Sequence, residues 1–110
     1  YYQRRFGVEL DPEKEITSCI GSKEGLASLA RSITKPGDVI AVPNPSYPIH
    51  IYGFILSECA VWYLKKDFLA DQPFDLMAEL HRAVKDSNPK PSILVVNYPC
   101  NPTAEVATLD

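Results

Sequence analysis

Short apolar runs alternate with amphipathic stretches along this chain, and that alternation restricts the fold more than any other feature. Four runs have the length and composition of buried strands, and they cover residues 16–20, 39–42, 60–64 and 92–97. The stretches between them repeat apolar residues at helical spacing. Strands and helices that alternate with short connections predict an α/β fold, with a mainly parallel sheet and helices on both faces.

Three helices are expected between these strands. The first covers Ser22 to about Ile33, and the second covers roughly residues 47–57 with Ser46 as its N-cap. The third follows Asp75, which we expect to cap it. His81 lies beside the apolar face of this last helix without a second histidine, cysteine or carboxylate at ligand spacing, so we interpret it as structural.

Composition excludes several classes of partner. The chain has 110 residues and 45% hydrophobic content, which suits one globular domain. A net charge of −3 argues against a nucleic-acid partner. No apolar run approaches the roughly 20 residues that span a bilayer, so no membrane partner is expected and the predicted location is cytoplasmic. Cys19, Cys59 and Cys100 lie far apart, which predicts reduced, partly buried thiols and no metal site.

Both ends of the chain lie within predicted elements. Residues 1–7 have the pattern of a final helical turn closed by Gly7. Residues 108–110 stand where a new element is expected to begin. We therefore expect residues 1–110 to be a single partial domain of a longer protein.

A glycine turn at Gly21 joins the first apolar run to the first helix. The first amides of that helix have no carbonyl partner within it, and the helix dipole favours a negative charge beside them. This turn predicts a phosphate site, although a tight strand-to-helix connection without a ligand has the same pattern.

Two further loops follow predicted strands, at residues 43–48 and 97–103. Since the carboxyl ends of parallel strands meet at one edge of a sheet, these loops and the Gly21 turn are expected to lie together. That convergence is the main reason to expect a binding site.

The three loops resemble motifs of the class I/II aminotransferases, which are pyridoxal 5′-phosphate enzymes of fold type I. The matching segments are residues 21–27, 43–50 and 97–103, and the likeness extends from Tyr2 to Asp110. It is strongest for the branch of alanine and LL-diaminopimelate aminotransferases. Ala104 departs from the commonest form of the family, which has glycine after Asn-Pro-Thr.

The resemblance implies roles for four residues of a part of the cofactor-binding large domain. Ser22 and Lys23 would hold the cofactor phosphate, chiefly through backbone amides. Tyr47 would stack on the pyridine ring, and Asn101 would donate its amide to the phenolic oxygen. Without a cofactor, Tyr47 would instead be a core aromatic and Asn101 a turn residue. The family also implies cis peptide bonds before Pro45 and Pro102.

The resemblance places the catalytic groups outside this chain. The Schiff-base lysine, the aspartate beside the pyridine nitrogen and the arginine for the substrate carboxylate all lie further along the family's sequence. None of the lysines present has that motif, and they are Lys14, Lys23, Lys35, Lys65, Lys66, Lys85 and Lys90. We therefore assign no catalytic residue and expect the isolated chain to be inactive. The family also implies a homodimer.

The leading interpretation is a segment of an aminotransferase that moves an amino group between an amino acid, such as alanine, and a 2-oxo acid. A carbon–sulfur lyase of the same fold remains open, because these loops do not select the reaction. A non-catalytic regulatory domain and an α/β scaffold without a ligand also remain open. In the family the three later strands are neighbours, whereas strands from downstream sequence separate the first strand from them.

Overall fold

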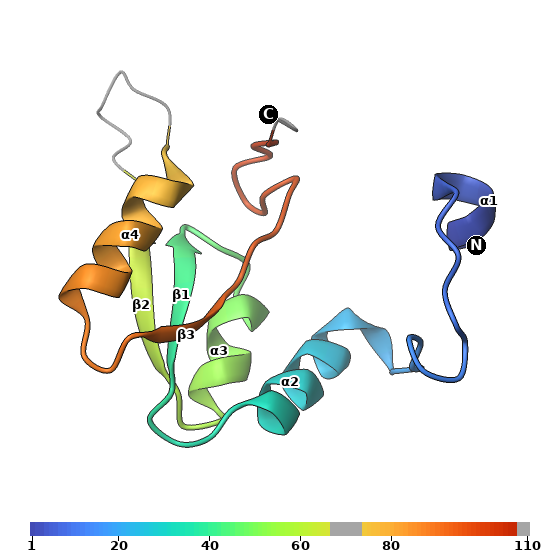
Figure 1. The fold of residues 1–110 in the computed structure, drawn as a ribbon, viewed down its shortest axis with the longest axis horizontal. Helices are drawn as coiled ribbons and strands as arrows, with labels where there is room; N and C mark the ends of the chain where they lie inside the picture. The colour runs from blue at the N-terminus through green and yellow to red at the C-terminus, as the bar shows by residue number, and fades with distance from the viewer. Residues whose placement is uncertain (67–73, 108–110) are drawn as a thin grey trace.

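A parallel sheet forms the centre of the computed structural model, which describes residues 1–66 and 74–107 (Figure 1). Strand β1 (Val39–Asn44) lies between β2 (Ala60–Lys65) and β3 (Pro91–Leu94), and both pairings are parallel. The prediction that the three later strands are neighbours is confirmed. The last strand, however, ends at Leu94 instead of residue 97.

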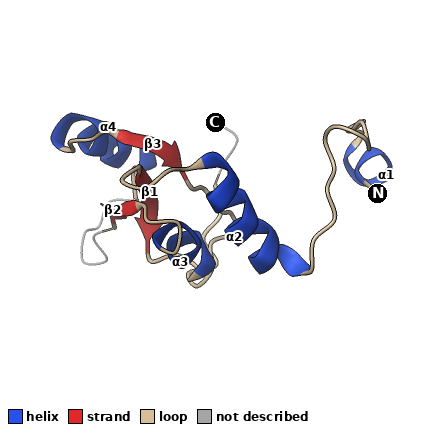
Figure 2. Cartoon of the chain, turned by 90° about the horizontal axis from the view of Figure 1, so that it is seen from below, coloured by secondary structure: helices blue, strands red, loops and turns tan. Residues whose placement is uncertain are grey.

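Helices cover both faces of this sheet, as predicted for an α/β fold. Figure 2 shows α4 (Leu76–Asp86) on one side of the strands and α2 (Gly21–Ile33) and α3 (Ile49–Ile55) on the other. A fourth helix, α1 (Tyr2–Phe6), lies apart from the sheet and ends at Gly7 in the left-handed conformation, which confirms the predicted helix end (Figure 1). No helix among the described residues is long and apolar enough to cross a membrane.

The central strand contributes to the core on both sides. Toward α2 and α3, the buried cluster consists of Ala30, Ile40, Val42, Phe54 and Cys59. Toward α4, the buried cluster consists of Ala41, Leu64 and Ala83. Successive strand residues point to opposite faces, so Ile40 and Val42 enter one cluster and Ala41 enters the other. This explains why residues 39–42 form a continuous apolar run.

The prediction of a buried strand at residues 16–20 is wrong. This segment has no strand in the structure, and the side chains of Ile16 and Ile20 are 56% and 93% exposed. A strand requires a neighbouring backbone that satisfies its hydrogen-bonding groups. The sheet order β2-β1-β3 gives residues 16–20 no such neighbour.

The predictions that Ser46 caps the second helix and that Cys19 is partly buried are also wrong, whereas Cys59 and Cys100 are buried and partly buried as predicted. Helix α3 begins at Ile49 with Pro48 as its N-cap, so Ser46 does not cap it. The Ser46 hydroxyl instead lies 3.1 Å from Nδ1 of His50. Cys19 is exposed because the segment that carries it is not part of the sheet.

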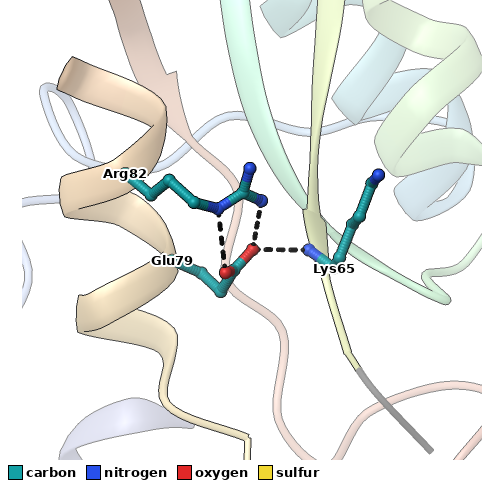
Figure 3. Close-up of polar contacts among 3 residues, drawn as sticks. All are labelled: Lys65, Glu79 and Arg82. Carbon is teal, nitrogen blue, oxygen red and sulfur yellow. Dashed lines mark hydrogen bonds and ion pairs between the residues drawn. The ribbon is translucent and has the colours of Figure 1, made fainter. Parts of the chain in front are cut away.

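Helix α4 is fixed to the edge strand by polar contacts (Figure 3). Its predicted cap is confirmed, because the Asp75 carboxylate accepts a hydrogen bond of 2.9 Å from the amide of Ala78. One turn later, Oε2 of Glu79 accepts from the Lys65 amide of β2 at 2.9 Å and from Nη2 of Arg82 at 2.6 Å. Glu79 therefore satisfies an amide at the edge of the sheet that would otherwise be open to pairing with another chain.

We expect Glu79→Gln to destabilise the protein at neutral pH by about 0.2–1 kcal/mol, the range for surface ion pairs. The hydrogen bond from Arg82 is the main cause that lowers the pKa of Glu79 in the folded protein. The contribution is therefore complete above the ordinary pKa of a glutamate, and it is lost as the pH falls through the lowered pKa. Unfolding of the two proteins at pH 7 and at pH 3 measures this difference, which should shrink at pH 3. Glu9→Gln, at an exposed glutamate, is the control and should show no such trend.

Candidate cofactor site

A cavity of about 210 Å³ lies where the predicted loops meet, at the carboxyl ends of β1 and β3 and the start of α2. Its lining residues are Ser22, Leu26, Tyr47, Ile49, His50, Asn97 and Asn101. The structure thus brings together Ser22, Tyr47 and Asn101 from three separate segments. Lys23 does not line the cavity, but its ammonium group lies 5.4 Å from the centroid of the Tyr47 ring.

The start of α2 presents hydrogen-bond donors to this cavity. Gly21 has a φ of 80°, a left-handed conformation that glycine adopts without strain. The N-cap residue of α2 is Ile20, whose side chain cannot accept a hydrogen bond. The first turn of α2 therefore has no side-chain cap. Ser22, whose side chain carries a hydroxyl, lies at the same end of the helix and lines the cavity. These groups suit an anionic ligand.

Lys23 and Tyr47 form a pair beside this helix end. A hydrogen bond with Tyr47 raises the pKa of Lys23, and the electrostatic effect of the phenol adds to the increase. The lysine is therefore cationic at neutral pH. Its charge adds to the positive end of the α2 dipole, which strengthens the preference for an anion.

The loop that carries Asn101 is fixed by three contacts. The Cys100 amide donates to the Glu105 carbonyl at 2.7 Å, and the Ala104 amide donates to the Cys100 carbonyl at 2.7 Å. Nζ of Lys66, just after β2, forms an ion pair of 2.6 Å with Glu105. These contacts close the loop on itself and connect it to the end of β2, which is the edge strand opposite β3.

Cis peptide bonds occur at both predicted positions. The structure has them at Asn44-Pro45 and Asn101-Pro102, and also at Asn88-Pro89 and Tyr98-Pro99, which were not predicted. The thiol of Cys100 lies 3.9 Å from the Pro45 carbonyl, so the two site loops are in direct contact.

We expect Ala104→Gly to stabilise the protein by about 0.5–1 kcal/mol. Ala104 has a φ of 58°, and the left-handed region costs a residue with a Cβ roughly 1–2 kcal/mol, part of which the greater freedom of glycine in the unfolded chain offsets. Thermal unfolding of the full-length variant measures the gain. The matched control is Ala107→Gly, outside the left-handed region, which should be neutral or destabilising. A destabilised Ala104→Gly protein would contradict the assignment of strain.

Sequence reasoning missed four lining residues of the cavity: the apolar Leu26 and Ile49 and the polar His50 and Asn97. Asn97 is the last residue of the strand predicted at residues 92–97, so its place at a carboxyl strand end was available as a signal. His50 gave a weaker signal, because its relation to Ser46 depends on the conformation of the loop before α3. Among the described residues, no group of three or more His, Cys, Asp or Glu side chains could hold a metal ion.

The donor set fits a planar, phosphorylated ligand such as pyridoxal 5′-phosphate. The start of α2 offers donors for an anion, and the side chain of Asn101 offers an amide. Tyr47 offers an aromatic face, since its ring is half-buried and borders the cavity.

Comparisons with known proteins agree with this chemistry. The family described as aminotransferase class I and II matches residues 1–110. The chain is 50% identical to AatC of Rhizobium meliloti and 44% identical to the glutamate-pyruvate aminotransferase AlaC of Escherichia coli, over its whole length in both cases. It is 41% identical to an LL-diaminopimelate aminotransferase of Natranaerobius thermophilus.

The same comparisons show how much of each relative the chain represents. It covers 26% of AatC and of AlaC and 28% of the Natranaerobius protein, so it spans about a quarter of their length. Among solved structures, substrate-bound BacF from Bacillus subtilis matches with a TM-score of 0.72 and 32% identity, over 96% of this chain and 26% of that one.

Proposed function

Because this chain belongs to the aminotransferase class I and II family, we propose that the whole protein transfers an amino group between an amino acid and a 2-oxo acid. Pyridoxal 5′-phosphate is the proposed cofactor. One observation carries the proposal for this segment: Ser22, Tyr47 and Asn101, from three separate parts of the chain, line one cavity. The names of AlaC and of the diaminopimelate enzymes support an amino-acid substrate, with alanine as the first candidate.

The proposed roles follow from the position of each residue. The amides at the start of α2 and the Ser22 hydroxyl bind the phosphate, while Lys23 supplies positive charge beside it. Tyr47 fixes the plane of the ring, and Asn101 donates a hydrogen bond to its phenolic oxygen. When bound, the cofactor withdraws electrons from the bonds at the substrate α-carbon. The residues of this chain orient it for that chemistry.

Further parts of the proposal concern the complete protein. Residues 1–110 are proposed to be one segment of its cofactor-binding large domain, with the Schiff-base lysine supplied by a different segment. We also propose a cytoplasmic homodimer, as is usual for this family. Size-exclusion chromatography with light scattering tests the dimer.

Absorption spectroscopy of the full-length protein tests the proposed function. We expect a visible band after cofactor is added, its loss on addition of L-alanine, and its return with 2-oxoglutarate. A band that persists with L-alanine but is lost with LL-diaminopimelate would indicate that LL-diaminopimelate, and not alanine, is the substrate. Release of pyruvate and ammonia over many turnovers from a substrate with a β-sulfur, such as L-cystathionine, without a 2-oxo acid acceptor would indicate a carbon–sulfur lyase.

Two results would overturn the proposal or part of it. Absence of any cofactor band would contradict the proposed enzymatic activity, and a regulatory domain or a scaffold without a ligand would then remain as the explanation. Transamination by residues 1–110 alone would contradict the assignment of the catalytic lysine to another segment. The isolated chain should therefore be assayed beside the full-length protein at equal concentration.

A further inference from the structure

We infer that His50, anchored by Ser46, is a positioning residue that holds the Tyr47 ring in the orientation the cofactor requires. This inference rests on the proposed function, because it gives His50 and Ser46 a role at that same site. It assigns a role to two residues to which the family resemblance gave none.

The geometry around His50 connects all three residues. The His50 side chain is buried, with 8% of the residue exposed, and it borders the cavity. Its Nδ1 lies 3.1 Å from the Ser46 hydroxyl. Its ring meets the Tyr47 ring edge to face, with centroids 6.0 Å apart and an interplanar angle of 73°. In addition, the His50 amide donates to the Tyr47 carbonyl at 2.9 Å.

The protonation state of His50 is consistent with this role. Burial lowers the pKa of His50, so the ring is neutral at physiological pH. A neutral imidazole has one donor nitrogen and one acceptor nitrogen, and the hydroxyl of Ser46 can pair with either form of Nδ1. A buried polar ring without a partner would be costly, and the hydrogen bond to Ser46 removes much of that cost.

The consequence for Tyr47 follows from its neighbours in the chain. Ser46 precedes Tyr47 directly, so the Ser46–His50 contact fixes the loop on one side while the T-shaped contact with the imidazole restrains the ring on the other. An edge-to-face contact has a preferred geometry, unlike a general apolar contact. The ring is therefore oriented before any ligand arrives.

Variants of the full-length protein test this inference. We expect Ser46→Ala and His50→Phe each to raise the dissociation constant for pyridoxal 5′-phosphate by about 3–10-fold, the cost of one hydrogen bond. The circular-dichroism signal in the absorption band of the bound cofactor should be smaller in the same variants, since this signal depends on the orientation of nearby aromatic rings. The double variant should bind no more weakly than the weaker single variant, because both changes remove the same contact. Ser46→Thr keeps the hydroxyl and should restore wild-type affinity.

Ser57→Ala is the matched control. Ser57 is also bonded through its hydroxyl to α3, since it donates to the Gly53 carbonyl at 3.0 Å, but it does not border the cavity. The inference is overturned if Ser46→Ala and Ser57→Ala bind cofactor equally well and give the same dichroism as wild type. If wild-type protein binds no cofactor, the proposed function itself fails and this inference fails with it.

Discussion

Tyr47→Ala is expected to weaken binding of pyridoxal 5′-phosphate to the full-length protein by about 10–100-fold. The change removes an aromatic face at the cavity, and such a ring contributes roughly 0.5–1.5 kcal/mol beyond the apolar area that it buries. Alanine at this position also leaves the imidazole of His50 without its aromatic neighbour. Titration of the apoprotein with cofactor, followed by absorbance, measures the change.

Tyr47→Phe is the matched control for this prediction. Phenylalanine keeps the ring and loses only the phenol that pairs with Lys23. We expect its affinity to stay within about threefold of wild type, since Lys23 is exposed and such contacts contribute little. Equal affinity of the alanine variant and wild type would show that the ring does not contact the cofactor.

Ile40→Ala is expected to lower the free energy of unfolding by about 2–5 kcal/mol, the largest change in stability that we predict. The Ile40 side chain is completely buried at the centre of β1, where it packs against residues of α2 and α3. Alanine leaves a cavity between these layers that the surrounding strands cannot fill. Chemical unfolding of the full-length protein, followed by circular dichroism, measures the loss.

Ile33→Ala makes the same change on the surface and serves as the control. Ile33 is 53% exposed at the end of α2, so its replacement should change stability by no more than about 0.5 kcal/mol. Ile40→Val should fall between the two variants, at about 0.5–1.5 kcal/mol. A loss for Ile40→Ala as small as that for Ile33→Ala would contradict the position of Ile40 in the core.

Much of the fold could be predicted because its signals are local in the sequence. Residues 39–42 are apolar without interruption, which is typical of a strand covered on both faces, and they form the centre of β1. Asp75 caps α4 through a hydrogen bond to its own first turn. Residues 16–20 show the limit of such signals, because a strand also needs a neighbouring strand that no local pattern reveals.

The candidate site was predictable in part for a similar reason. The rule that parallel strands end at one edge predicted that the loops of Tyr47 and Asn101 meet, and both residues line one cavity. Ser22 lines the same cavity, although the strand expected before it is absent. The rule says nothing of which further side chains enter it. His50 reaches the cavity because α3 begins at Ile49, later than the sequence suggested, and the Ser46 hydroxyl then pairs with the imidazole.

The ion pair between Lys66 and Glu105 has a consequence for the entropy of binding. It joins the end of β2 to the loop of Asn101, which the two hydrogen bonds between Cys100, Ala104 and Glu105 already close. A loop fixed in this way has few conformations left to lose when a ligand arrives. Part of the ordering cost of the site is thus met when the chain folds, and more of the interaction energy of Asn101 remains for affinity.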